Sequence, residues 1–168
     1  MRHTVERLAS ELARRLAADG LALTCAESCT GGWLSKVLTD TPCSSRWFDR
    51  GFVTYSNAAK HSMLGVREET LARYGAVSAE TVLEMAHGAL ANSCAALSVA
   101  ISGIAGPGGG SAEKPVGTVW FAWADADGWS AARMMCFSGD REAVREHAVA
   151  AALEGLLGRL EGAPERAG

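Results

Sequence analysis

The chain has 168 residues, a length typical of one domain that buries most of its apolar surface around a single core. Hydrophobic residues make up 48% and charged residues 21%, values close to the globular average, which excludes a disordered chain. The net charge of -3 gives no indication of a surface for nucleic acid or membrane.

The first half of the chain predicts two strands set among helices. Apolar residues at helical spacing mark an amphipathic helix over 3–18, which Asp19-Gly20 ends. The elements that follow in chain order are a strand at 21–26, a turn at 27–30, a helix at 30–38, a strand at 51–56, a helix at 57–63 capped by Asn57, a helix at 67–73, and a helix at 79–92 capped by Ser78.

The second half predicts three strands and a closing helix. A strand at 97–103 leads into the glycine-rich loop GIAGPGGGSAEKP. Two more strands flank Asp127-Gly128, a pair typical of a β-hairpin turn. The remaining elements are those two strands, at 116–124 and 129–139, a helix from Asp140 to about 160, and a tail at 161–168 that we expect to fray.

This order of elements predicts one domain over 1–168 with an ordered core at about 3–160. The fold class is α/β: a three-layer α/β/α sandwich with a mixed, mainly parallel sheet and one late antiparallel hairpin. Ligands of such sheets bind at the carboxyl ends of the strands. We therefore expect three segments to converge there, namely 27–32, 102–111 and the residues after Tyr55.

The stretch CAESCTGG, residues 25–32, carries an acid, two thiols, two hydroxyls and two glycines. A tight turn between a strand and a helix leaves backbone N–H groups free, and such groups attract a phosphate, a carboxylate or a developing oxyanion. Gly31 and Gly32 would let a ligand approach the backbone closely. The alternative is a plain helix start with Ser28 or Thr30 as its cap.

The second glycine-rich stretch, GIAGPGGGS at 103–111, is neither a P-loop nor a dinucleotide fingerprint. No Gly-Lys-Ser/Thr follows at the required spacing, and no helix clearly opens from it. Ser102 and Gly103 nevertheless lie at a strand end, where a small ligand can meet a hydroxyl and the backbone. The alternative is a flexible surface loop.

Lys60 lies on a predicted helix just after the strand that ends near Tyr55. A lysine at such a place is often solvated, but a desolvated lysine beside a serine can lose its proton and activate the hydroxyl. No histidine lies near a strand-end motif, so a Ser-Lys pair is the simplest nucleophile that the pattern supports.

Arg141 stands at the start of the last predicted helix, in SGDREAV. A cation there opposes the helix dipole unless an anion lies nearby. Arg141 is therefore a candidate ligand for a phosphate or carboxylate, with a surface ion pair as the alternative.

The cysteines and histidines do not predict a metal site. The five cysteines are odd in number and irregularly spaced, and the four histidines are scattered singly. No apolar run is long enough to span a membrane, and the first 20 residues lack a signal-peptide core. We therefore expect a cytoplasmic protein with reduced thiols, no metal and no membrane association.

Together, AESCTGG, GFVTYSNAAK, GAVS, ISGIAGPGGGSAEKPVGTVWFA and FSGDREAVR occur in an order that resembles the C-terminal domain family of the competence- and damage-inducible protein CinA. Within that family, the chain resembles the stand-alone members that are nicotinamide mononucleotide deamidases. The resemblance extends from about residue 5 to 158, and it implies hydrolysis of nicotinamide mononucleotide to nicotinate mononucleotide and ammonia in pyridine nucleotide salvage, without a cofactor.

The resemblance also implies the site. Ser28 matches the family's nucleophile, Lys60 matches its general base, and Tyr55 belongs to the catalytic site. Ser102 stands where many members have threonine. The expected substrate-binding residues are Thr30, Gly31, Gly32, Ser102, Gly103, Gly106 and Arg141. The oxyanion donors are left open between the N–H groups of 30–32 and those of 103–106, as is the choice between an acyl-enzyme and direct attack by water.

Three further questions stay open from the sequence alone: the identity of the nucleophile, whether the chain is catalytic, and its oligomeric state. Cys25 or Cys29 is a competing nucleophile, because thiolates are intrinsically more reactive than hydroxyls. A second hypothesis for the whole chain is a non-catalytic nucleotide-binding or regulatory module of the CinA type. The resemblance also implies a homodimer, for which Trp33, Trp47 and Phe48 are either interface or core residues.

Overall fold

The computed structural model describes residues 1–162, which form a five-stranded sheet in the order β2-β1-β3-β4-β5. The pairings of β1 with β2 and with β3 are parallel, and those of β4 with β3 and with β5 are antiparallel. Only β4 therefore runs against the other strands, as expected for a mixed sheet with a late hairpin. The strands are β1 (Leu23–Glu27), β2 (Phe48–Val53), β3 (Leu97–Gly103), β4 (Thr118–Asp125) and β5 (Ser130–Cys136).

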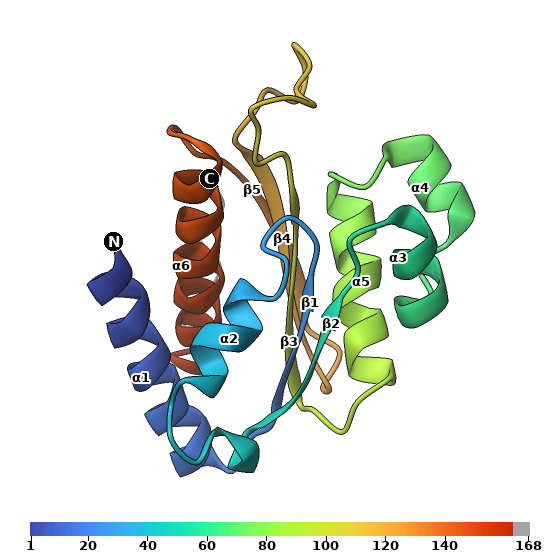
Figure 1. Ribbon diagram of the computed structural model, residues 1–168. Coiled ribbons are helices and arrows are strands. Elements are labelled where there is room, and N and C mark those ends of the chain that lie inside the picture. Colours follow the sequence, from blue (N-terminus) through green and yellow to red (C-terminus); the bar gives the residue numbers. More distant parts are fainter. Residues whose placement is uncertain (163–168) are drawn as a thin grey trace.

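Helices cover both faces of this sheet, which confirms the predicted three-layer α/β/α architecture (Figure 1). One face carries α1 (Arg2–Asp19), α2 (Trp33–Thr39) and α6 (Arg141–Leu160). The other face carries α3 (Asn57–Leu64), α4 (Glu68–Tyr74) and α5 (Ala79–Ala91). A short 3₁₀ helix, Ser44–Arg46, precedes β2. None of the helices within residues 1–162 combines the length and the apolar character that a membrane span requires.

Successive side chains of the central strands alternate between two apolar clusters, one on each face of the sheet. In β1, Leu23 and Cys25 pack in the cluster beneath α1 and α6, whereas Ala26 packs in the cluster beneath α5. The strand is buried along its whole length, as is typical of parallel strands covered on both sides. Adjacent residues at the end of β1 consequently face different helical layers.

Several predicted boundaries differ from the structure for local reasons. The helix expected at 30–38 begins at Trp33, because Gly31 and Gly32 have φ values of 59° and 97°, a left-handed conformation that cannot continue a right-handed helix. The cap of α3 is Ser56, not Asn57: the Ser56 side chain accepts a hydrogen bond from Ala59 N at 3.0 Å.

The second strand covers Phe48–Val53 instead of 51–56, because its register is set by pairing with Leu23–Glu27 of β1. The cap Ser78 is confirmed, since its side chain accepts a hydrogen bond from the backbone of its helix. Asp140, where the last helix was expected to begin, is the cap of α6, and its side chain accepts from Ala143 N. Of the tail expected to fray at 161–168, residues 163–168 lie outside the described part of the chain.

Candidate active site

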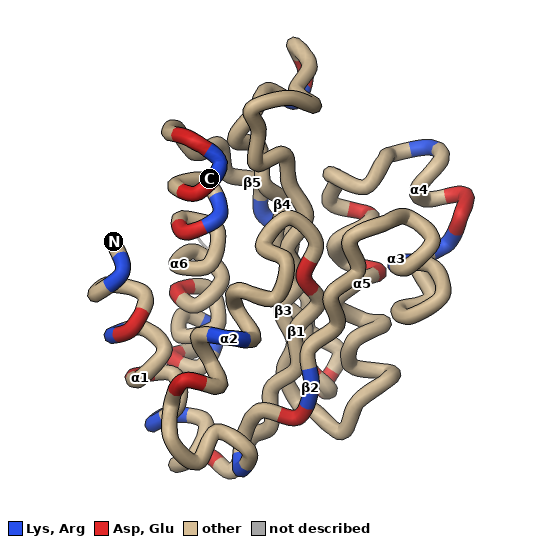
Figure 2. The backbone as a smooth tube through the Cα atoms, in the orientation of Figure 1, with Lys and Arg blue, Asp and Glu red and all other residues tan. Residues whose placement is uncertain are grey.

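Charged residues gather on the outer helices and the loops of the protein (Figure 2). Within residues 1–162, two charged side chains depart from that pattern and are almost fully buried: Glu27, 0% exposed, and Lys60, 1% exposed. Both lie at the carboxyl edge of the parallel strands, on opposite faces of the sheet. Buried charges are rarely kept without strong partners, so this edge is the first place to look for chemistry.

Lys60 projects from α3 toward the end of β1. Its Nζ atom lies 2.9 Å from Ser28 Oγ and donates to the backbone oxygen of Thr54 at 2.8 Å. Ser28 follows directly after β1, and its backbone N–H donates to Ile101 O of β3 at 3.0 Å, which anchors it to the neighbouring strand. The tertiary structure therefore brings together the serine and the lysine that the sequence predicted as a pair.

Burial lowers the pKa of the Lys60 ammonium below its usual value, and the nearby thiol of Cys29 opposes this only in part. The described residues offer Lys60 a hydroxyl and a carbonyl as partners but no carboxylate, so little compensates the loss of hydration. A neutral amine with two N–H groups and a lone pair can accept the proton of Ser28 while still donating to Thr54 O.

Glu27 holds the turn around Ser28 from the opposite face of the sheet. Its carboxylate accepts from Thr30 Oγ1 at 2.6 Å, from the backbone N–H of Gly32 and of Leu34 at 3.1 Å each, and from the backbone N–H and hydroxyl of Ser35 at 2.8 Å each. These donors engage both carboxylate oxygens and so fix the Glu27 side chain against the turn. No role was predicted for Glu27 from the sequence, although an acid just before a predicted helix start is a recognisable capping signal.

Arg145, on α6, contacts the same turn, although the sequence analysis did not predict it as a site residue. Its Nε donates to Cys29 O at 3.0 Å and its Nη2 donates to Thr30 O at 3.1 Å. The guanidinium carbon lies 5.4 Å from the ring centroid of Trp33. The sequence offers two hints: Arg145 lies one helical turn after Arg141, and it is the last residue of the motif FSGDREAVR.

Arg141 links two of the predicted segments at the mouth of the site. Its Nη2 donates to the hydroxyl of Tyr55 at 2.8 Å, and its Nη1 donates to Gly106 O at 2.9 Å. Tyr55 is 61% exposed, so this contact lies at the surface and not beside the buried Lys60. The start of α6, the loop after β2 and the glycine-rich loop therefore converge, as expected from the strand ends.

Ser102 ends up buried near the end of β3, 1% exposed. Ser98 faces α5, since its hydroxyl donates to Ala86 O, and the alternation of a strand puts Ser102 on that same face. Ser28 and Lys60 also lie on this side of the sheet. The Ser102 hydroxyl makes no hydrogen bond to another atom of residues 1–162, so it remains available to a ligand.

The predicted glycines have structural reasons of their own. A Cβ at Gly103 would lie 2.9 Å from Thr118 O, and one at Gly106 would lie 2.5 Å from Val116 Cγ1. The N–H of Gly31 donates to Ser28 O, and that of Gly32 donates to Glu27. Both N–H groups are thus engaged within the protein.

The thiols of the stretch CAESCTGG are poor nucleophiles. Cys25 and Cys29 are both buried. Burial raises the pKa of the Cys29 thiol to about 11 and raises the pKa of Cys25 further still. Neither therefore forms a thiolate near neutral pH, whereas Cys43, Cys94 and Cys136 are exposed and far along the chain from the motif.

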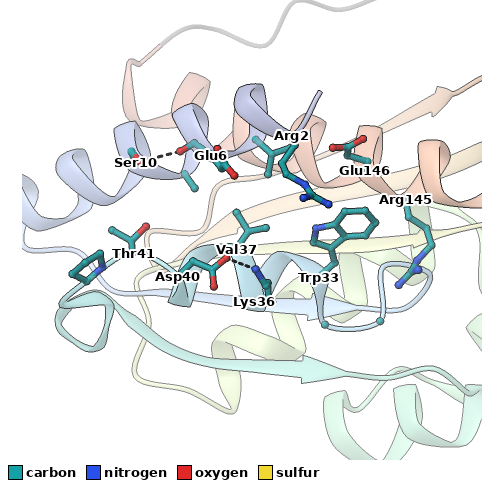
Figure 3. A pocket seen from close by; sticks show the side chains of 15 residues that line it. Arg2, Glu6, Ser10, Trp33, Lys36, Val37, Asp40, Thr41, Arg145 and Glu146 are labelled. Carbon is teal, nitrogen blue, oxygen red and sulfur yellow. Dashed lines mark hydrogen bonds and ion pairs between the residues drawn. The ribbon is translucent and has the colours of Figure 1, made fainter.

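A groove of about 840 Å³ lies between α1, α2 and α6 (Figure 3). It is on the face of the sheet opposite α3, the helix that carries Lys60. Trp33 and Arg145 project into it from α2 and α6, with Lys36 and Arg2 nearby. Neither Ser28 nor Lys60 lines this groove. Trp47, considered above as an interface residue, is 3% exposed and belongs to the core.

Comparisons with known proteins show the family and the fold of the chain. The family model described as the CinA C-terminal domain matches residues 5–160. The Escherichia coli K12 protein named nicotinamide-nucleotide amidohydrolase PncC is 61% identical over 150 residues, which cover 89% of this chain and 91% of the relative. A Pseudomonas putida protein of the same name is 51% identical, covering 91% and 95%. The crystal structure of the competence/damage inducible protein CihA from Agrobacterium tumefaciens has a TM-score of 0.91 at 48% identity, covering 94% of this chain and 96% of that one.

Proposed function

The chain belongs to the CinA C-terminal domain family, and we propose that it is a nicotinamide-nucleotide amidohydrolase. It converts nicotinamide mononucleotide and water to nicotinate mononucleotide and ammonia, a reaction of pyridine nucleotide salvage. The observation that carries the proposal is the contact of 2.9 Å between Lys60 Nζ and Ser28 Oγ, in a chain 61% identical to a relative with that name.

In the first step, Lys60 acts as the general base and Ser28 as the nucleophile. The neutral amine takes the hydroxyl proton while Ser28 Oγ bonds to the carboxamide carbon, whose oxygen becomes an oxyanion. The oxyanion then collapses, the C–N bond breaks, and Lys60 returns its proton to the departing nitrogen. Ammonia leaves, and an ester joins the nicotinoyl group to Ser28.

In the second step, water takes the place of ammonia. Lys60 accepts a proton from the water, the resulting hydroxide bonds to the ester carbon, and collapse of this intermediate breaks the bond to Ser28 Oγ. Lys60 then returns the proton to Ser28. The contact of Lys60 with Thr54 O, at 2.8 Å, keeps Nζ in place through both steps.

The remaining predicted residues bind the nucleotide. Arg141 donates one guanidinium N–H to Tyr55 Oη and one to Gly106 O. Its remaining N–H groups can bind a phosphate. Tyr55 closes the catalytic site from the surface side, and the free hydroxyl of Ser102 faces the buried side. Gly103 stays a candidate wall of this site, whereas Gly31 and Gly32 line the groove between α1, α2 and α6 and the Thr30 hydroxyl is bonded to Glu27.

The test is ammonia release from purified protein supplied with nicotinamide mononucleotide. We expect equal amounts of ammonia and nicotinate mononucleotide from the native protein, and neither from the Ser28→Ala variant. Tight binding of the nucleotide without ammonia release would instead indicate a non-catalytic module.

We further propose that the enzyme is a cytoplasmic homodimer, as the family resemblance implies. Trp33 and Phe48 are only half-buried in the single chain and are available for an interface, unlike Trp47. Sedimentation equilibrium tests this proposal, because a mass of one chain across the micromolar range would contradict it.

A further inference from the structure

We propose that the backbone N–H groups of Cys29 and Thr30 form the oxyanion hole, and that Arg145 is the positioning residue that holds them in place. This inference rests on the proposed amidohydrolase reaction, in which the carboxamide oxygen becomes negative. The pair shares only Thr30 with the two sets of donors that the sequence left open, 30–32 and 103–106, because the N–H groups of Gly31 and Gly32 are engaged within the protein. The inference also gives a role to an arginine that the predicted site did not include.

The first observation is which N–H groups of the turn remain free. The N–H groups of Cys29 and Thr30 donate to no other residue of 1–162, although the two residues are 6% and 0% exposed. Within that range, the one contact of the Cys29 N–H is with the thiol of its own residue. Buried backbone N–H groups are nearly always paired, so two consecutive free ones next to a nucleophile call for an acceptor. The neighbouring N–H groups are engaged: Ser28 with Ile101 O, Gly31 with Ser28 O, and Gly32, Leu34 and Ser35 with the Glu27 carboxylate.

The second observation is the direction of the free groups. The carbonyls of Cys29 and Thr30 both point at Arg145, which lies on the α6 face of the sheet. The peptide bond between them is trans, so the Thr30 N–H points away from the Cys29 carbonyl and hence away from Arg145. The opposite direction is that of Lys60, on the α3 face, to which Ser28 Oγ also turns. The Thr30 N–H is thereby directed to the side where the reacting carbon will lie.

Arg145 suits this task because its guanidinium is a planar fork. Nε and Nη2 hold two successive carbonyls at 3.0 and 3.1 Å, a match that the single ammonium of a lysine cannot reproduce. Its position over the Trp33 ring, at 5.4 Å, restricts its rotation. No carboxylate within residues 1–162 pairs with it, so its positive charge also favours a developing oxyanion nearby.

The competing donors belong to the glycine-rich loop. The N–H groups of Ala105 and Gly106 are likewise free within the described residues. Gly106 is itself buried, but its carbonyl accepts from Arg141, which also donates to the exposed Tyr55, so this end of the loop lies beside the surface contact. The Cys29 N–H belongs to the residue next to the nucleophile, a position that often supplies an oxyanion donor in acyl transfer. The loop N–H groups are better placed for the nucleotide than for the reacting carbonyl.

Steady-state kinetics of Arg145 variants test the positioning role. We expect Arg145→Lys and Arg145→Ala to lower kcat by about 10- to 100-fold while KM changes little, because loss of one oxyanion donor typically costs ~100- to 1,000-fold and these variants only loosen the donors. The matched control is Arg159→Lys on the same helix, since Arg159 pairs with Asp125 and stacks over Trp129 away from the turn. The proposal would be overturned by an unchanged kcat, by a change in KM alone, or by an equal decrease of kcat in the Arg159→Lys control.

Chemical rescue separates positioning from loss of structure. The groove between α1, α2 and α6 opens onto Arg145 and Trp33, so it gives millimolar guanidinium a route to the space vacated in Arg145→Ala (Figure 3). We expect guanidinium to restore kcat in this variant and to leave Ser28→Ala inactive. Equal inactivity of both in guanidinium, with Arg145→Ala shown to be folded by its amide spectrum, would count against the positioning role.

A direct test on the native protein uses an analogue of nicotinamide mononucleotide in which a boronic acid replaces the carboxamide. Ser28 Oγ bonds to boron, its proton passes to Lys60, and the resulting tetrahedral boronate carries a negative charge like the oxyanion. We expect the amide protons of Cys29 and Thr30 to move downfield in the adduct but not with nicotinate mononucleotide bound. Downfield shifts at Ala105 and Gly106 instead would overturn this assignment alone, whereas failure of Ser28 to form an adduct would overturn the proposed function on which it rests.

Discussion

Lys60 Nζ lies 2.9 Å from Ser28 Oγ, although the two residues are 32 positions apart and come from different layers of the sandwich. The contact is formed where Lys60 is 1% exposed, and Thr54 O is its second partner. Water is therefore largely excluded from the pair, and the lysine can serve as a base instead of a surface cation.

The identity of the nucleophile is the first prediction. Ser28→Ala should lower kcat by at least about 1,000-fold, because the attacking oxygen is lost while the nucleotide contacts remain. Cys29→Ala should keep most of the activity, since burial holds the pKa of this thiol at about 11 and it is not ionised at neutral pH. Ammonia release by the two variants, side by side, is the measurement. Loss of activity in Cys29→Ala with retention in Ser28→Ala would reverse the assignment.

The pH profile tests the protonation state of Lys60. Burial lowers its pKa from the ordinary 10.5, and only the neutral amine can act as a base. The kcat/KM of the native enzyme should therefore rise with pH and level off once Lys60 is neutral, at a pH below 10.5. Lys60→Met should lose turnover far more than nucleotide binding and should show no such rise. An equal loss of turnover and binding would make Lys60 a ligand contact only.

The same lowered pKa makes stability depend on pH. Between the folded pKa of Lys60 and its unfolded value of about 10.4, the unfolded chain binds more protons than the folded one. The stability that Lys60 contributes is thus present above the unfolded value and is lost as pH falls through the folded value. The free energy of unfolding of the native protein, minus that of Lys60→Met, should increase with pH across this window and stay flat below it. Urea unfolding at several pH values measures this difference, and a decrease with pH would contradict the direction of the shift.

Gly88 decides how closely α3, the helix of Lys60, can approach α5. A Cβ at this position would lie 2.0 Å from Leu64 O, a backbone atom that has no room to move aside. Gly88→Ala should therefore destabilise the fold by about 1–3 kcal/mol, and it should also lower kcat because Lys60 shifts with its helix. Gly158→Ala on α6 is the control: its Cβ meets no atom within 4 Å, and we expect a gain of about 0.5–1 kcal/mol. Thermal unfolding with kinetics on the same samples compares the two, and equal stabilities would refute the packing argument.

Arg141 is expected to bind the phosphate of the nucleotide. Arg141→Ala should raise the KM for nicotinamide mononucleotide by at least about tenfold, the loss typical of a hydrogen bond to a charged group, with a smaller effect on kcat. Nicotinamide riboside lacks the phosphate, so its slow hydrolysis should be nearly the same in the variant and the native enzyme. A similar loss for both substrates would show that Arg141 acts through Tyr55 and Gly106 and not through the phosphate.

The local sequence pattern was sufficient to predict most of the helices and strands. The alternation of helices and strands, the hairpin at Asp127-Gly128, the cap Ser78 and the start of the last helix at Asp140 all depend on neighbours within a few residues, and the structure agrees with them. The start of α2 was predicted three residues too early, because the left-handed conformations of Gly31 and Gly32 are imposed by the turn and by its contact with Glu27.

The sequence by itself determined the order of the elements, the segments that would meet at the strand ends, and the residue types Ser28 and Lys60 in those segments. Only the tertiary structure decided that Lys60 is shielded from water, that Glu27 accepts from the N–H groups of Leu34 and Ser35 in the first turn of α2, and that Arg145 reaches Cys29 O from 116 residues away. The physical reason is that periodicity and capping act between near neighbours, whereas desolvation and the direction of a peptide N–H are set by layers that the chain brings together only on folding.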